Sequence, residues 1–189
     1  MNLPNKLTLM RVFLIPVFMV FATMRWWLAA GIVFAVASFT DFLDGYLARK
    51  NNLVTDFGKF ADPLADKLLT TVAFIYMLVD GVCSPIVLTI ILAREFAVRG
   101  VRMIAAGAPG GKVIAANMWG KVKTVLQMLT IIFYYVGMAV ENNLFNNPAA
   151  SMNVVQMVAY ILCWLVALVT LISGVQYIWG NRHFIDTAK

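Results

Sequence analysis

Four aspartates stand at fixed spacing between residues 41 and 66, where two strongly apolar segments meet. The stretch reads DFLDGYLARKNNLVTDFGKFADPLAD, which reduces to the pattern DxxDGxxAR(x8)GxxxDxxxD. If both flanking segments are helical, each residue is rotated by about 100° around the helix axis from the one before it. The key positions of each half of the pattern then share one helix face. These positions are Asp41, Asp44, Gly45 and Ala48 in the first half, and Gly58, Asp62 and Asp66 in the second. The fold must therefore bring two acidic helix faces together.

The composition indicates a membrane protein. Of 189 residues, 62% are hydrophobic and only 13% are charged, and the mean hydropathy is +0.83. This number of charged residues is too small to cover the surface of a soluble domain of this length. Most apolar side chains must therefore face lipid or one another.

Six apolar segments are long enough, or nearly so, to cross a bilayer as helices. They cover residues 11–24, 28–49, 58–79, 86–106, 118–140 and 152–179. The mixed polar and apolar residues 1–10 suit a short helix lying along the membrane surface. The prediction is an all-α integral membrane protein with six transmembrane helices and an N-terminal interfacial helix, forming one domain over residues 1–189.

The net charge of +6 does not indicate nucleic-acid binding, because the basic residues lie at the ends of apolar segments rather than among aromatic residues on a polar surface. Six spans place both termini on one side, and that side receives 14 of the 15 basic residues, all but Arg25. The asymmetry predicts that this side is cytoplasmic. Both termini and the aspartates then lie on the cytoplasmic side of a cytoplasmic membrane.

Four clustered carboxylates need a cation. Two unit charges ~4 Å apart at an effective dielectric of ~20 repel by ~4 kcal/mol. The stretch contains no His or Cys, so a hard divalent ion such as Mg²⁺ or Mn²⁺ is favoured over zinc. Salt bridges to Arg49 and Lys67 are the alternative.

The small residues of the motif favour a ligand. Gly45, Ala48 and Gly58 leave room for a ligand to approach the backbone, although a close contact between helices would explain them equally well. Arg49, at the rim, is placed to hold a phosphate with its bidentate guanidinium.

A second charged group lies in the fourth apolar segment. Glu95 and Arg99 are four residues apart and can form an ion pair on one helix face. Ionisable residues inside a span usually face a cavity. The surplus positive charge therefore predicts an anion pocket, formed by Arg94, Arg102, Lys121 and Lys123, for a phosphorylated cosubstrate.

The complete motif from Asp41 to Asp66 resembles the signature of the CDP-alcohol phosphatidyltransferase family. The stretches NLPNKLTLMR, ILAREF and WGKVKTVLQ extend the similarity to bacterial members that use glycerol 3-phosphate. The resemblance implies a six-helix membrane enzyme, a homodimer, with a metal-dependent site at the cytoplasmic side.

By position, the resemblance assigns a role to each motif residue. The implied metal ligands are Asp41, Asp44, Asp62 and Asp66, and Asp66 is also the implied general base. The implied CDP-binding residues are Gly45, Ala48 and Arg49, with Asn5 and Thr8 approaching the nucleotide from the N-terminal helix.

The reaction implied is transfer of a phosphatidyl group from CDP-diacylglycerol to sn-glycerol 3-phosphate, giving phosphatidylglycerophosphate and CMP. The basic pocket would hold the acceptor phosphate, and the lipid tails would remain in the membrane. Other acceptors stay open within the family: phosphatidylglycerol (cardiolipin synthase), serine or inositol phosphate. Outside it, a divalent-metal transporter also places carboxylates in a membrane, but here the acids gather at one face instead of lining a path across.

Overall fold

The computed structural model describes the backbone of residues 3–51, 56–107, 118–145 and 153–182, and the side chains of residues 9–40, 67–107, 118–142 and 153–182. All secondary structure in these ranges is helical, as the sequence predicts. The helices are α1 (Leu3–Thr23), α2 (Trp27–Asn51), α3 (Asp56–Val79), α4 (Pro85–Gly107), α5 (Met118–Phe145) and α6 (Val154–Gly180).

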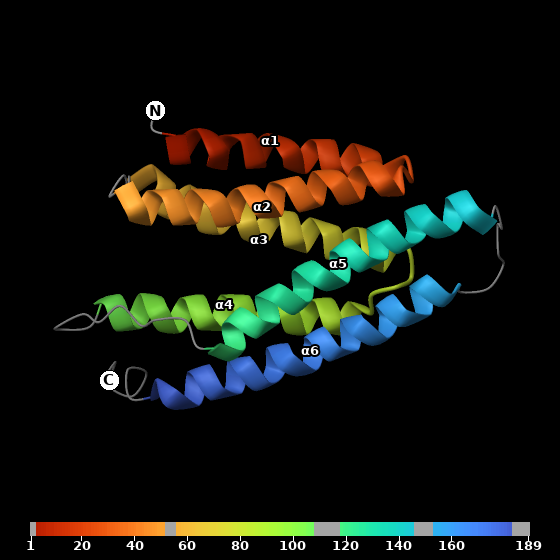
Figure 1. Cartoon of the computed structure of the whole chain (residues 1–189). Coiled ribbons are helices and arrows are strands. Elements are labelled where there is room, and N and C mark those ends of the chain that lie inside the picture. The colour runs from red at the N-terminus through yellow and green to blue at the C-terminus, as the bar shows by residue number, and fades with distance from the viewer. Residues whose placement is uncertain (1–2, 52–55, 108–117, 146–152, 183–189) are drawn as a thin grey trace.

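The six helices form an elongated bundle in which successive helices run in opposite directions (Figure 1). Helix α1 packs on α2 and α3, α5 packs on α2 and α6, and α4 packs on α6. The start of α1 and the end of α6 lie at the same end of the bundle (Figure 1). The end of α2 and the start of α3, which carry the aspartate motif, lie at that end as well.

Aromatic side chains join four helices at the centre of the bundle. The ring of Phe18 in α1 lies 6.1 Å from that of Phe34 in α2, 6.2 Å from Tyr76 in α3 and 5.3 Å from Tyr135 in α5. Such pairs each add roughly 0.5–1.5 kcal/mol beyond burial of their area. A Cβ on Gly31 would lie only 3.2 Å from Cβ of Tyr135, so glycine permits the close contact of α2 with α5.

Two described helices are long and apolar enough to cross a membrane: Met118–Asn142 and Val154–Gly180. Three further apolar helical stretches, Leu9–Thr23, Trp27–Thr40 and Lys67–Val79, are shorter. Many large apolar side chains of α6 point outward, such as Val175, which is 64% exposed. An outward apolar face of this kind suits lipid rather than water.

Helix α1 differs from the prediction at its start. It runs without a break from Leu3 through Arg11 to Thr23, so a separate interfacial helix over residues 1–10 is not confirmed. The sequence placed the boundary between the surface helix and the first span at Arg11, where the apolar run begins. In the structure Arg11 is instead fully buried, since α1 packs against both α2 and α3.

Candidate functional site

The aspartate motif lies on two helices that pack against each other, α2 and α3. The backbone is helical at all four aspartates, so Asp41 and Asp44 are about one turn apart on α2, and Asp62 and Asp66 are about one turn apart on α3. This is the helical arrangement on which the predicted acidic faces depend.

Several predicted site residues lie outside the described side chains, so their predicted roles remain predictions. They are Asp41, Asp44, Gly45, Ala48, Arg49, Asp62 and Asp66 of the motif, and Asn5 and Thr8 of α1. Among the side chains that the structure does describe, no three His, Cys, Asp or Glu residues gather as metal ligands.

The second charged group is centred on Glu95 of α4. Its Oε1 accepts a hydrogen bond from Nζ of Lys123 in α5 and lies 3.4 Å from Nη1 of Arg94. Its Oε2 lies 3.8 Å from Nζ of Lys67 in α3. Three cations from three helices thus meet one carboxylate, and we call these four residues the Glu95 cluster. Its two least exposed cations, Arg94 and Lys123, share this single carboxylate, which leaves one positive charge in surplus.

The Glu95 cluster is largely shielded from solvent. The side chain of Lys123 is 1% exposed, that of Arg94 12% and that of Glu95 14%. Removing charges from water is unfavourable unless opposite charges compensate for it. A surplus of buried positive charge is therefore an arrangement that an anionic ligand would stabilise.

Lys67 links the Glu95 cluster to the aspartate motif. It directly follows Asp66 in the sequence, and its ammonium group reaches the Glu95 carboxylate. The second half of the aspartate motif and the basic residues of α4 and α5 therefore border the same region of the bundle.

The structure brings together two of the four residues predicted to form the basic pocket. Arg94 and Lys123 meet at Glu95. Arg102 lies two helical turns further along α4, where its Nε donates to the Tyr177 hydroxyl at 3.0 Å and its guanidinium lies 5.5 Å from the centre of that ring. Lys121 is exposed at the start of α5.

Helix α6 contributes contacts that the sequence did not predict. Nη2 of Arg94 donates to Oγ of Ser173 at 2.7 Å. The next residue, Gly174, lets α6 approach the stem of Arg94, and Gly120 of α5 lies beside its guanidinium. Small residues such as these indicate close contacts between helices. The sequence does not show that the side chain packed against them is Arg94.

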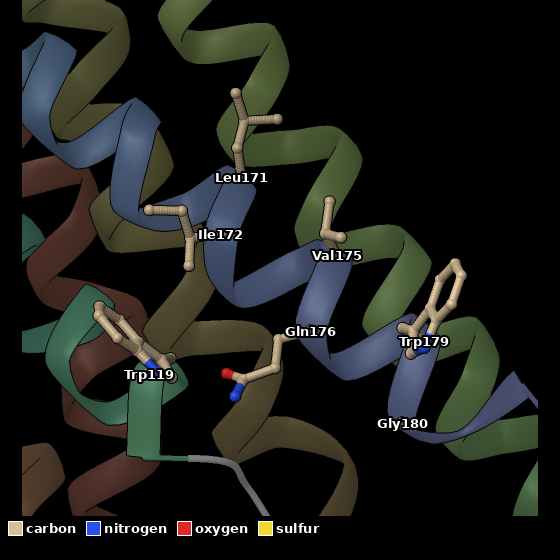
Figure 2. Close-up of a pocket in the computed structure, with 7 residues that line it drawn as sticks. All are labelled: Trp119, Leu171, Ile172, Val175, Gln176, Trp179 and Gly180. Carbon is tan, nitrogen blue, oxygen red and sulfur yellow. The ribbon is translucent and has the colours of Figure 1, made fainter.

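A pocket of about 750 Å³ lies between the start of α5 and the last turns of α6. Figure 2 shows Trp119 from α5 facing a row of α6 side chains that includes Leu171, Val175 and Trp179. Gln176 is the polar side chain among them. The apolar lining suits hydrocarbon better than a phosphate group, so the predicted anion site does not coincide with this pocket.

A smaller polar group lies at the other end of the bundle, beyond the end of α3. The hydroxyl of Tyr134 donates to Oδ2 of Asp80 at 2.8 Å, and Nη2 of Arg25 lies 3.9 Å from Oδ1 of Asp80. Burial raises the pKa of Asp80 above its ordinary value, although the Tyr134 hydrogen bond and the charge of Arg25 act in the opposite direction. The charged form is thus less favourable here than in water.

Comparison with known proteins gives one consistent result. The family model described as CDP-alcohol phosphatidyltransferase matches residues 1–172. A Bacillus subtilis protein named CDP-diacylglycerol–glycerol-3-phosphate 3-phosphatidyltransferase is 40% identical over 203 aligned residues, which cover 100% of this chain and 99% of the relative. Proteins of the same name from Rickettsia felis and Pseudomonas fluorescens are 37% and 36% identical, covering 97% and 100% of this chain and 97% and 90% of the relatives.

Proposed function

We infer the reaction from one premise: the chain belongs to the CDP-alcohol phosphatidyltransferase family. It transfers a phosphatidyl group from CDP-diacylglycerol to glycerol 3-phosphate in phospholipid biosynthesis. The observation that carries this conclusion is similarity over the full length of relatives that bear this name. The products that follow from the chemistry are phosphatidylglycerophosphate and CMP.

We propose that the four aspartates hold Mg²⁺ or Mn²⁺. Their placement on helical backbone of two packed helices, with carboxylate oxygens as the only ligand type, fits a hard divalent cation. Asp41, Asp44 and Asp62 would be ligands, with Asp66 completing the set. When bound, the ion would neutralise charge on the pyrophosphate and stabilise CMP as the leaving group.

In the proposed step, Asp66 acts as general base. The primary hydroxyl of the acceptor attacks the β-phosphorus of CDP-diacylglycerol, its proton passes to the Asp66 carboxylate, and the bond from that phosphorus to CMP breaks. Gly45, Ala48 and Arg49 would border the CDP group. Asn5 and Thr8 would approach it from α1, whose start lies at the same end of the bundle as the motif (Figure 1).

We propose that the Glu95 cluster binds the acceptor phosphate, mainly through Arg94 and Lys123. The surplus positive charge and the low exposure of these side chains support this role. The contact of Lys67 with Glu95 supports a position beside Asp66, where the acceptor hydroxyl must be delivered. Lys121 and Arg102, which lie outside the cluster, would guide the anion toward it.

The membrane arrangement is also a proposal. All six helices would cross the bilayer, with the motif and both termini on the cytoplasmic side of a bacterial membrane. The common location of the start of α1 and the end of α6 (Figure 1) and the excess of basic residues in the segments at that end support this orientation. The functional unit would be a homodimer.

The test uses purified full-length protein in detergent with CDP-diacylglycerol, labelled glycerol 3-phosphate and Mg²⁺. We expect CMP release with the natural residue at position 66 and none with Asp66→Asn. The matched control is Asp80→Asn, which removes a carboxylate at the opposite end of the bundle and should retain activity.

Acceptor competition completes the test. CMP release with phosphatidylglycerol, serine or inositol phosphate but not glycerol 3-phosphate would contradict the acceptor assignment. Absence of CMP release with every acceptor, together with metal flux in vesicles, would instead support a transporter.

A further inference from the structure

Arg94 is held at both terminal nitrogens of its guanidinium. Nη1 lies 3.4 Å from Oε1 of Glu95, the adjacent residue on α4. Nη2 donates to Oγ of Ser173 on α6, at 2.7 Å. Because the two partners belong to different helices, the plane of the guanidinium is fixed by the packing of α4 against α6.

Two glycines close the space around the same side chain. A Cβ at Gly174 would lie 3.0 Å from Cγ of Arg94, and a Cβ at Gly120 would lie 3.2 Å from its Nη2. Both distances are shorter than ordinary van der Waals contact. A larger residue at either position would therefore require Arg94 to shift by a few tenths of an ångström.

One donor of Arg94 has no acceptor in the described part of the protein. Its Nε is buried and makes no hydrogen bond there. An arginine has five N–H donors, and its fork of nitrogens binds phosphate in a bidentate manner. A buried donor without a partner needs an explanation, and a ligand oxygen would supply the acceptor.

We propose that Ser173, Gly120 and Gly174 form a slot that orients Arg94 toward the acceptor phosphate; this rests on the proposed role of the Glu95 cluster. The three are positioning residues, since they act through Arg94 and not on the substrate. A long, flexible side chain loses entropy when it binds a ligand, and a side chain already held in its bound orientation loses less. The slot thus strengthens acceptor binding and leaves lipid binding unchanged.

The test compares Ser173→Ala, Gly120→Ala and Gly174→Ala in the full-length protein. Each should raise the KM for glycerol 3-phosphate on the order of three- to thirtyfold, because a misplaced charged group binds its anion less well. The KM for CDP-diacylglycerol should change by less than about twofold. Gly100→Ala on α4 is the matched control, since a Cβ there meets nothing within 4 Å.

A double-mutant cycle separates positioning from general stability. In an Arg94→Ala background, the three slot substitutions should cause no further rise in the KM for glycerol 3-phosphate, because the group they orient is absent. A full additional rise in that background would overturn the proposal. Thermal unfolding of each variant identifies any loss of fold. Ser173→Ala adds no atoms, so it still tests the positioning role if a glycine variant unfolds.

The result also distinguishes this inference from the proposed acceptor site. If Arg94→Ala leaves the KM for glycerol 3-phosphate unchanged, the assigned role of Arg94 is wrong and the slot has no function in binding. If Arg94→Ala raises that KM but the slot variants behave like Gly100→Ala, the acceptor site stands and the slot proposal is wrong.

Discussion

The side chains of Asp80 and Glu95 are both largely shielded from water, at 13% and 14% exposed, but they differ in the number of cations beside them. Asp80, beyond the end of α3, has one cationic neighbour, Arg25, and one hydroxyl donor, Tyr134. Glu95, within α4, has three cationic neighbours. The Asp80 group is electrically balanced and needs nothing more, whereas the Glu95 cluster has a positive surplus. The balanced group joins helices, and the unbalanced group is suited to bind an anion.

Solvent exposure strengthens the contrast. The side chain of Arg25 is 73% exposed, so water screens its charge, whereas that of Lys123 is 1% exposed. Charges interact far more strongly in a protein interior than in bulk water. The surplus at Glu95 is therefore not neutralised by solvent. Substitutions in both groups can test the comparison.

The largest effect is expected from Glu95→Ala, which removes the carboxylate shared by two largely buried cations, Arg94 and Lys123. Breaking a buried ion pair by removing one partner costs roughly 3–5 kcal/mol, and thermal unfolding in detergent measures the loss. The control is Asp80→Ala, which leaves one hydroxyl without its acceptor and one exposed cation. It should cost about 1–3 kcal/mol.

Added phosphate gives this comparison a second readout. Inorganic phosphate should raise the Tm of Glu95→Ala more than that of the unaltered protein, since the anion takes the place of the carboxylate. It should have no such selective effect on Asp80→Ala. Equal shifts in all three proteins would contradict the assignment of the Glu95 cluster as an anion site.

The next effect separates two lysines that are two residues apart in α5. Lys123→Ala removes a buried charge of the cluster and should raise the KM for glycerol 3-phosphate on the order of tenfold or more. Lys121→Ala removes an exposed charge and should raise it only about two- to threefold, an effect that added salt should abolish. Equal and salt-independent effects would show that burial does not decide which lysine binds the acceptor.

The sequence predicted the helices well because their signals are local. Apolar segments of sufficient length predict each helix, and the observed start of α4 at Pro85 suits a residue that is favoured in the first turn of a helix. The acidic faces also depend on local helical spacing, and the structure confirms the helical backbone at the aspartates. Their ligand roles remain predictions.

The contacts of Glu95 and Arg94 could not be predicted because their signals are not local. Helical spacing pointed to Arg99 as a partner for Glu95, but the packing of α5 brings Lys123, 28 residues away, to the carboxylate. The partner of Arg94, Ser173, is 79 residues away. Arg11 illustrates the same difficulty, because a charged residue before an apolar run indicates a membrane boundary unless the fold buries it.

A smaller effect is expected from pH on Asp80. Because burial raises the pKa of the folded carboxyl above 3.8, the folded state holds its proton more tightly than the unfolded state. The stability contribution of Asp80 is then greatest below the unfolded pKa and declines as the pH rises through the folded pKa. Asp80→Asn should remove this decline. The Tm of Asp80→Asn minus the Tm of the unaltered protein should therefore increase as the pH rises. A decrease of this difference with rising pH would contradict the effect of burial.

The smallest effect is expected at Arg25, whose backbone lies in the left-handed region with φ of 58°. The left-handed conformation costs a non-glycine residue roughly 1 kcal/mol, and an exposed ion pair contributes about 0–1 kcal/mol. In Arg25→Gly these two terms oppose each other, so the free energy of unfolding should change by less than about 0.5 kcal/mol. Arg25→Ala loses the pair and keeps the strain, so it should be less stable than Arg25→Gly by about 1 kcal/mol.

Equal stability of Arg25→Ala and Arg25→Gly would mean that the turn is unstrained. A large loss in both would mean that the single cation beside Asp80 is as necessary as the three beside Glu95.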